Sequence, residues 1–168
     1  FRSCLMEIVI SDTNIFIDLW NIGLLKRFCE LPLSIHTTDF IIGELKTQGV
    51  KDAIAQLHQE GKITIKTFKS NEYAEIMSLQ DKNPSFQDCT VLYYALNGDY
   101  KLLTGDRNLR VIAERHGLQV SGIIYVMDEL LHHDILSKEE YITKLKALLE
   151  SNQRLPTKEI MKRIENSF

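Results

Sequence analysis

The sequence predicts an α/β fold, a single domain in which a parallel β-sheet is flanked by helices on both faces. Short apolar runs of strand type alternate along the chain with longer segments whose apolar residues have helical spacing. The connections are short, and strands joined by helical crossovers pair in parallel beneath helices. The 168 residues suit one domain, and 44% hydrophobic with 26% charged residues is typical of a globular chain.

The first half of the chain carries three predicted strands separated by helices. Short apolar or alternating runs predict strands, the third at or near the edge of the sheet, over 7–11, 33–36 and 63–67. Apolar residues recurring at three or four positions predict helices over 14–28, 39–45, 51–59 and 71–79. We expect Thr38 or Asp39 to cap the second of these helices and Gly61 to end the third.

The second half continues the alternation after a turn predicted over 81–84. Strands are predicted over 101–104 and 119–121, and helices over 85–98, 108–116, 122–133, 138–150 and 156–166. Ser85 and Asp88 have the serine-x-x-acid spacing of a helix N-terminus, and Gly117 follows the last residue of a helix. As far as residue 121, strands and helices therefore alternate as a parallel sheet requires.

Composition argues against several classes of protein. The net charge of −3 does not favour a protein that binds nucleic acid mainly through a large basic surface. The three cysteines lack Cys-x-x-Cys spacing, which favours reduced thiols and a cytoplasmic location over a disulfide framework or a zinc site. Membrane-spanning and signal-peptide patterns are not found, and Met6 is expected to be the natural start, with residues 1–5 added to it.

Four acids stand where an acidic side chain is hard to explain by local structure. Asp12 and Asp106 directly follow apolar, strand-like runs. Glu44 lies in an otherwise apolar segment, and Asp88 begins an apolar-periodic helix. The carboxyl ends of parallel strands and the first turns of helices meet at one edge of an open α/β sheet, where ligands bind. We therefore expect the four carboxylates to converge.

Such a convergence needs a cation or a shared proton. Two carboxylates roughly 5 Å apart repel by about 3 kcal/mol at an effective dielectric constant of 20. Hard oxygen ligands select Mg²⁺ or Mn²⁺ over zinc, and Mg²⁺ keeps several of its waters. A metal held in this way lowers the pKa of a water molecule and neutralises charge on a phosphate under attack. The four acids therefore predict a divalent-metal site and chemistry at phosphate.

Each acid taken singly also has a structural explanation. Asp12 and Asp106 are placed to cap helices, and Asp88 suits the positive end of a helix dipole. Glu44 is the least easily explained in this way, because unpaired acids are seldom found on buried faces. A shared site is favoured over four separate structural roles. Asp18, by contrast, is expected to lie on the solvated face of its helix.

In their order and spacing, the motifs that contain the four acids resemble those of a PIN domain. The motifs are Asp12-Thr13-Asn14, Glu44 within 38–45, Ser85-x-x-Asp88 and Thr104-Gly105-Asp106. The resemblance covers roughly residues 6–121, and the last helices are similar to the tail of one branch of bacterial PIN proteins. It implies a PIN-like nuclease domain over 6–150 with a C-terminal helical tail of the same domain over 151–168.

The resemblance implies an Mg²⁺- or Mn²⁺-dependent endoribonuclease that hydrolyses RNA phosphodiester bonds. Many small bacterial PIN proteins are VapC-type toxins of toxin–antitoxin pairs, and a lone catalytic domain of this size is expected to be one. The resemblance therefore also implies a cognate antitoxin protein that silences the enzyme. Such toxins are often homodimers, and a homodimer without membrane association is expected. Whether the substrate is RNA or DNA, and which sequence is cut, stays open.

The metal chemistry suggests a role for each of the four acids. Asp12 and Asp106 are expected to be direct metal ligands. Asp88 is expected to bind the metal directly or through a water molecule. Glu44 is expected to hold a water or a second metal, or to orient the attacking water. One-metal and two-metal mechanisms both stay open.

Four further residues are candidates for contact with the site or the substrate. Asn14 is placed to hold the neighbouring loop or a phosphate. Thr104 lies two residues before Asp106 and shares its side of the strand if the strand extends that far. Turn capping is the alternative role for both. Arg107 and Arg110 flank Asp106 one helical turn apart and are candidates for substrate phosphate, with a solvated helix face as the alternative.

Two other functions remain as alternatives. One is a phosphohydrolase with an aspartate nucleophile after the first strand, a pattern that wants a second Asp two residues further on. Asn14 occupies that position, which weakens this hypothesis. The other is a catalytically inactive PIN-like module that binds RNA or protein. The presence of all four acids counts against it.

Overall fold

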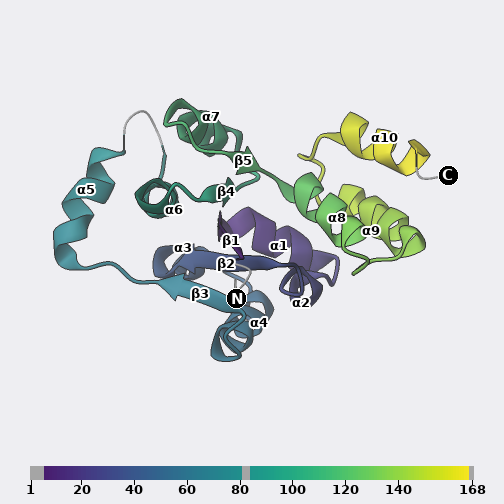
Figure 1. Ribbon diagram of the computed structural model, residues 1–168, viewed down its shortest axis with the longest axis horizontal. Helices are drawn as coiled ribbons and strands as arrows, with labels where there is room; N and C mark the ends of the chain where they lie inside the picture. Colours follow the sequence, from purple (N-terminus) through teal and green to yellow (C-terminus); the bar gives the residue numbers. More distant parts are fainter. Residues whose placement is uncertain (1–5, 81–83, 167–168) are drawn as a thin grey trace, which may run out of the picture.

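A five-stranded parallel sheet forms the centre of the protein, as predicted. The computed structural model describes residues 6–80 and 84–166. In these residues the strands follow the order β3-β2-β1-β4-β5, and every neighbouring pair is parallel (Figure 1). The strands are β1 (Glu7–Ser11), β2 (Leu33–Thr38), β3 (Ile63–Lys66), β4 (Lys101–Leu103) and β5 (Val120–Ser121). The edge position expected for the third strand is confirmed.

Helices connect the strands, and three of them follow the sheet at the C-terminal end. They are α1 (Thr13–Asn21), α2 (Leu25–Phe28), α3 (Asp39–Glu44), α4 (Gln48–Gln59), α5 (Tyr73–Ser78), α6 (Phe86–Gly98), α7 (Arg107–Arg115), α8 (Ile123–His132), α9 (Lys138–Ser151) and α10 (Thr157–Asn166), with a 3₁₀ turn at Ser70–Glu72. Within the described ranges, no helix is both long and apolar enough to cross a membrane. The expectations for residues 1–5 and for most of the turn over 81–84 fall outside the described residues.

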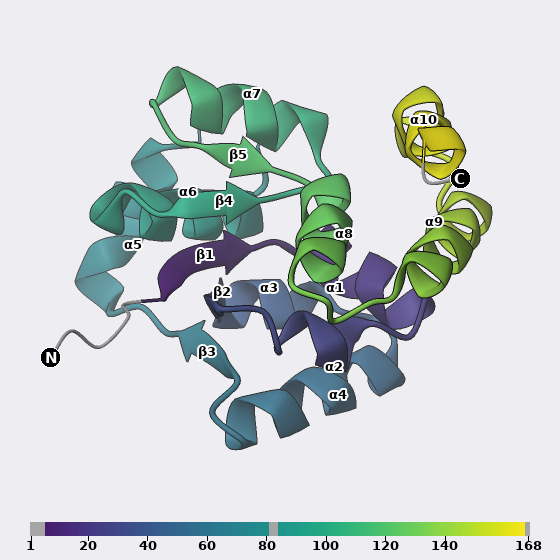
Figure 2. The same ribbon diagram turned by 45° about the vertical axis from the view of Figure 1, so that its right-hand side comes forward.

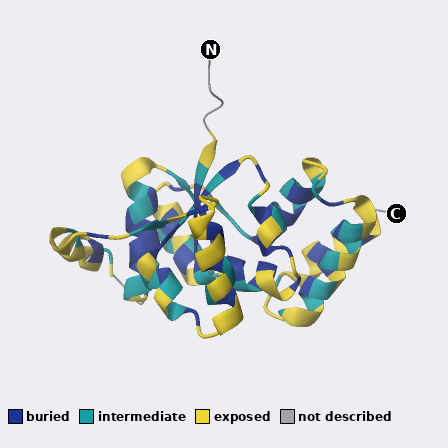
Figure 3. Ribbon diagram, turned by 90° about the horizontal axis from the view of Figure 1, so that it is seen from below, coloured by how far each residue is buried: buried dark blue, intermediate teal, exposed yellow. Residues whose placement is uncertain are grey.

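The sheet is covered on both faces, because successive strand residues alternate between two apolar cores. Val9, Ile35 and Leu103 pack into a core with α1, α2, α4 and α8. Ile10 and Leu102 point the other way, into a core formed with α3, α6 and α7. The helices show the matching pattern, with a buried stripe toward the sheet and an exposed stripe toward solvent (Figure 3). The predicted arrangement of helices on both faces is confirmed.

The continuous helix predicted over 14–28 is wrong, because Gly23 interrupts it. Gly23 has φ +73°, and its backbone N–H donates to Trp20 O at 3.1 Å. A residue without Cβ adopts this left-handed conformation with little strain, so α1 ends before Gly23 and α2 begins after it as a separate helix. The apolar spacing continued across the break because both helices bury their residues in the same core. Periodicity alone therefore did not reveal the break.

The C-terminal tail packs on the rest of the protein through apolar and polar contacts. Ile160 and Ile164 of α10 are buried in the core that contains β1. Arg163 of α10 binds Asp128 of α8, with Nη2 and Oδ2 2.9 Å apart. In Figure 1, α8, α9 and α10 lie together at one end of the molecule, with α5 at the opposite end. These contacts support the proposal that residues 151–168 belong to the same domain as residues 6–150.

Candidate functional site

The candidate acids lie near the carboxyl edge of the two central strands. β1 and β4 run side by side in the same direction, with Ser11 opposite Leu103 (Figure 2). Asp12 therefore follows β1 at the level where β4 ends, and Asp106 follows three residues after Leu103. Asp88 stands in the first turn of α6, and Glu44 is the last residue of α3. The parallel crossovers thus deliver all four to the edge where ligands bind in this class of fold.

Asp12 is a buried carboxylate at the N-terminus of α1, only 3% exposed. Its Oδ1 accepts a hydrogen bond from Ile15 N at 3.3 Å, and its Oδ2 accepts one from the hydroxyl of Thr104. Burial raises the pKa of Asp12 to about 7, and the nearby charge of Asp88 adds to this effect. The capping role is therefore real, but it does not by itself stabilise a charge held away from water.

Thr104 connects the two acids that follow separate strands. It is 1% exposed, its hydroxyl donates to Asp12, and its oxygen accepts from Asp106 N at 3.0 Å. Asp106 in turn caps α7, with Oδ1 2.9 Å from Leu109 N. β4 ends at Leu103, so the shared strand face considered for Thr104 and Asp106 is not the reason for their proximity. The hydroxyl of Thr104, in the turn after β4, connects Asp12 and Asp106 by hydrogen bonds instead.

Asp88 is the electrostatic centre of the group. It forms a capping box with Ser85, because Asp88 N donates to Ser85 Oγ at 3.0 Å and Asp88 Oδ2 accepts from Ser85 N at 3.4 Å. Burial raises the pKa of Asp88, and the charge of Asp106 raises it further. Asp88 also contributes to the raised pKa values of Asp12 and Glu44. Each of the other three acids is therefore close enough to Asp88 for the two charges to repel.

Glu44 reaches the network from α3 and is held by a residue that the sequence did not single out. Glu44 Oε2 accepts from the hydroxyl of Thr13 at 3.2 Å. Burial raises the pKa of Glu44, and the charge of Asp88 adds to the shift. Thr13 directly follows Asp12, so a hydroxyl next to a candidate ligand was the signal that could have identified it.

The network suits a hydrated hard cation better than a closed metal cage. Across residues 6–80 and 84–166, no three His, Cys, Asp or Glu side chains are close enough together to hold a metal ion unaided. The donors are all carboxylate oxygens, which Mg²⁺ and Mn²⁺ prefer, and Mg²⁺ usually keeps several waters as ligands. Burial and mutual repulsion disfavour the charged forms of Asp12, Glu44 and Asp88. A bound cation would offset both the cost of burying these charges and the repulsion between them, so the residues fit such an ion.

The remaining candidates differ in how near they come to the acids. Asn14 is exposed and lies against Gly105, where an added Cβ would be 3.4 Å from Asn14 Cβ. Arg107 is exposed at the first position of α7. Arg110 turns toward β5, since its Nη1 donates to Val120 O at 3.3 Å. The structure therefore places Asn14 and Arg107 at the rim and directs Arg110 away from the acids.

Asp18 does not lie on a solvated face as predicted. It is 4% exposed, and its Oδ1 accepts from Asn152 Nδ2 at 3.0 Å. Burial raises its pKa, and the bond from Asn152 lowers it. Asn152 follows α9, more than a hundred residues away in sequence, so the partner was invisible to local patterns. Asp18 anchors the C-terminal tail to α1 and takes no part in the acidic network.

A comparison with known families agrees with the fold. Residues 8–167 match the family described as PIN domain. The chain therefore belongs to the PIN-domain family, whose members are generally nucleases and typically use divalent metals. The resemblance to this family noted from the sequence is confirmed. No curated protein matches the chain.

Proposed function

We propose that the protein is a metal-dependent endoribonuclease that hydrolyses RNA phosphodiester bonds with water. The observation that carries this proposal is the network centred on Asp88, in which buried Asp12 and half-buried Glu44 and Asp106 lie close enough for their charges to interact with that of Asp88. A stable fold tolerates such repulsion when a bound cation relieves it. Because members of the PIN-domain family are generally nucleases, we expect the cation to bind a phosphate group of the substrate.

We propose Asp12, Asp106 and Asp88 as the residues that hold Mg²⁺ or Mn²⁺, with Asp88 acting directly or through a water. The metal, when bound, would lower the pKa of a water and offset charge on the phosphate. Thr104 holds Asp12 and the backbone of Asp106 at a fixed separation. Thr13 orients Glu44, which is placed to accept a hydrogen bond from the attacking water and to align it. Asn14 at the rim is placed to contact a phosphate oxygen.

The proposal is tested by cleavage of single-stranded and structured RNA in Mn²⁺, Mg²⁺ or EDTA. Wild-type protein is expected to cut RNA only with metal. Asp12→Asn is expected to abolish cutting, because the amide keeps the helix cap but loses the charge. Asp99→Asn makes the same chemical change at an exposed turn and should leave activity intact. Cleavage by pure Asp12→Asn protein at the wild-type rate would contradict the site assignment.

Two alternatives predict different outcomes in the same experiment. A catalytically inactive PIN-like module would bind RNA or protein and bind Mn²⁺ without cutting in any metal. An aspartate-nucleophile phosphohydrolase would release phosphate from small phosphate esters through Asp12. Asn14, where that chemistry wants an acid, is exposed and lies at the rim against Gly105. The ribonuclease proposal is therefore preferred, and a phosphate-release assay checks the alternative.

We also propose that the enzyme is the toxin of a toxin–antitoxin pair, that it is a homodimer, and that it works in the cytoplasm. Cys29 and Cys89 are free thiols, which suits a reducing compartment. Expression of the wild type should arrest bacterial growth, and Asp12→Asn should not. Co-expression of the neighbouring gene product should restore growth if it is the antitoxin. Light scattering tests the dimer, and a monomeric mass would contradict it.

A further inference from the structure

A cleft of about 720 Å³ opens beside the acidic network, on the side of β5. Thr104 and Gly105 form its inner end, and the first turns of α7 and α8 form two of its walls. The loop before α10, together with α10 itself, lines the remaining side. Because Thr104 also binds Asp12, the cleft begins where the acidic network ends. The cleft is therefore a neighbouring surface for a ligand that is bound at the acids and extends beyond them.

The cleft is positively charged in a protein whose net charge is −3. Four arginines line it against two acids, and the six residues are Arg107, Arg110, Arg154, Arg163, Asp128 and Glu159. This sign is opposite to that of the neighbouring acidic network. Since metal ions and phosphates need opposite surroundings, the two regions divide naturally into a metal-binding part and a phosphate-binding part.

The arginines of the cleft differ in whether their guanidinium groups already bind other groups of the protein. Arg163 binds Asp128 and Glu159, at 2.9 and 3.2 Å. Arg110 donates to Val120 O at 3.3 Å and to Glu114 at 3.5 Å. Arg107 and Arg154 are exposed, and in the part of the chain that the structure describes their guanidinium groups have no acceptor. Each presents donors suited to paired bonds with phosphate oxygens.

We propose that this cleft binds the single-stranded RNA that runs away from the scissile bond, with Arg107 and Arg154 holding its backbone phosphates. This inference rests on the proposed ribonuclease function. A strand with one phosphate at the acids carries a further phosphate at every nucleotide beyond, and the cleft next to Thr104 and Gly105 offers these phosphates a positively charged surface. Tyr125 and Leu155, both partly exposed, supply apolar surface beside the arginines for the bases.

The C-terminal tail thereby becomes part of the substrate site. Arg154 lies between α9 and α10, and its position depends on how α10 is fixed. The Arg163–Asp128 pair fixes α10 to α8, and the hydroxyl of Tyr141 donates to the same carboxylate at 2.6 Å. Asn152, two residues before Arg154, is bound by Asp18 of α1. These contacts hold Arg154 at the cleft from both ends of its loop.

The test is the affinity for a short fluorescein-labelled oligouridylate, measured in EDTA at several KCl concentrations so that no cleavage takes place. Arg154→Ala is expected to weaken binding about tenfold, since a bond to a charged group contributes about 1.4 kcal/mol or more. The slope of log affinity against log salt should fall by about 0.7 for the lost phosphate contact. Arg154→Lys, which keeps the charge, should recover most of the affinity and the slope.

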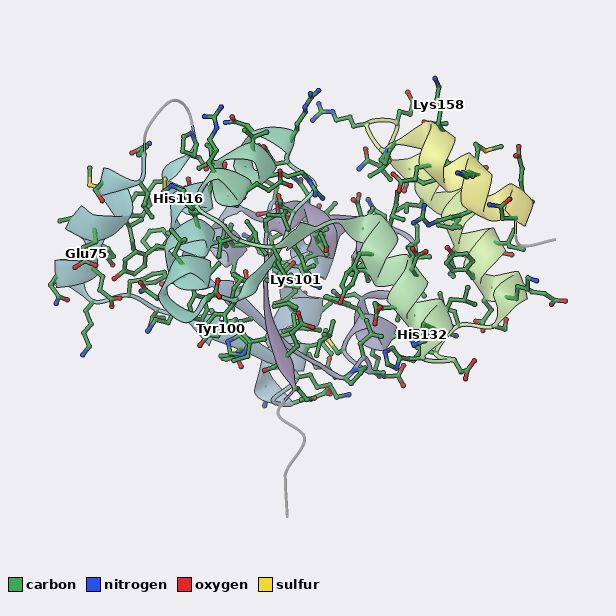
Figure 4. The ribbon with its side chains drawn as sticks, turned by 45° about the horizontal axis from the view of Figure 1, so that its top comes forward. Glu75, Tyr100, Lys101, His116, His132 and Lys158 are labelled. Carbon is green, nitrogen blue, oxygen red and sulfur yellow. The ribbon has the colours of Figure 1, made fainter. Side chains whose placement is uncertain are left out.

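Lys158→Ala is the matched control, because it removes the same charge from the same tail. Lys158 does not line the cleft and points away from the body of the protein (Figure 4). Its removal should change neither affinity nor slope. Equal weakening by both variants, or no effect of Arg154→Ala, would overturn the proposal. A polyglutamate peptide is tested in the same assay. If Arg154→Ala weakens binding of the peptide but not binding of the oligouridylate, the proposal is overturned and the cleft binds protein instead.

A parallel cleavage assay in Mn²⁺ separates this inference from the function on which it rests. Binding that depends on Arg154 without cleavage in any metal would contradict the ribonuclease proposal and support the cleft. Cleavage by the wild type, combined with binding that does not depend on Arg154, would contradict the cleft alone. The folding of each variant is checked by its melting temperature, which should match the wild type because Arg154 and Lys158 are both exposed.

Discussion

At the scale of single residues, Thr104 has the most demanding position in the proposed site. It is buried between two acids and uses both its donor and its acceptor capacity, toward Asp12 and toward Asp106 N. A valine of the same shape would leave a buried carboxylate and a backbone N–H without these partners. Such losses cost more than the hydrogen bond itself contributes, because both groups remain away from water.

Thr104→Val is therefore expected to lower the free energy of unfolding by about 2 kcal/mol. Metal affinity or cleavage should fall by about 10- to 100-fold, as for other residues that orient a metal ligand. Thr104→Ser keeps the hydroxyl and should retain most of both properties. Denaturant unfolding and Mn²⁺-dependent cleavage measure the two effects. Equal behaviour of the valine and serine variants would show that the hydroxyl has no role.

The raised pKa of Asp12 predicts how the stability of the metal-free protein depends on pH. Its pKa rises from 3.8 to about 7 on folding, so between these values the folded state keeps a proton that the unfolded state has lost. The contribution of Asp12 to stability is therefore fully present below about pH 4 and is lost as the pH rises toward 7. Glu44 and Asp88 are shifted in the same direction and add to the loss.

Melting temperatures measured in EDTA between about pH 4 and about pH 8 test this expectation. Asp12→Asn should flatten the decline and raise the melting temperature at neutral pH by a few degrees, because a buried charge is removed while the N-cap oxygen remains. Asp99→Asn, at an exposed turn, should follow the wild-type curve. A difference in melting temperature between wild type and Asp12→Asn that stays constant from about pH 4 to about pH 7 would contradict the raised pKa of Asp12.

At the scale of elements, the break between α1 and α2 depends on the backbone of one residue. Gly23→Ala places a Cβ on a residue with φ +73° and is expected to lower the free energy of unfolding by about 1–2 kcal/mol. Gly43→Ala is the matched control, since Gly43 lies within α3 and an added Cβ meets no atom within 4 Å. It should be neutral or stabilising. Denaturant unfolding of both variants decides the matter, and equal losses would contradict the role of Gly23.

At the scale of the whole molecule, metal binding and folding should be coupled. A cation that binds the folded state at about 100 times its dissociation constant adds about 2.7 kcal/mol, or about 5–10 °C in melting temperature for a chain of this size. Mg²⁺ or Mn²⁺ should therefore raise the melting temperature of the wild type. Asp106→Asn should lose most of this rise. Metal-dependent cleavage without any rise would indicate that the ion binds together with the substrate instead.

The order of strands and helices was predictable because each depends on neighbours in sequence. Alternating apolar residues mark strands, and apolar residues three or four apart mark helices, whatever the rest of the chain does. The parallel sheet then follows, because helical crossovers leave few other arrangements. The same local patterns showed that Asp12 and Asp106 follow strands and that Asp88 lies in the first turn of a helix. Their placement at one edge of the sheet could therefore be argued before the structure.

The sequence by itself determined the class of fold, the alternation of its elements and the four acids as candidates for one site. Tertiary structure alone decided that Asp18 is buried and bound by Asn152, and that Thr13 and Thr104 hold the acids in place. It also decided that the tail completes a positively charged cleft beside those acids. The physical reason is the distance in sequence over which each signal acts. Apolar periodicity depends on near neighbours in sequence and indicates which face of an element a residue occupies. Burial, charge repulsion and side-chain hydrogen bonds depend on partners that the fold brings from far away in sequence.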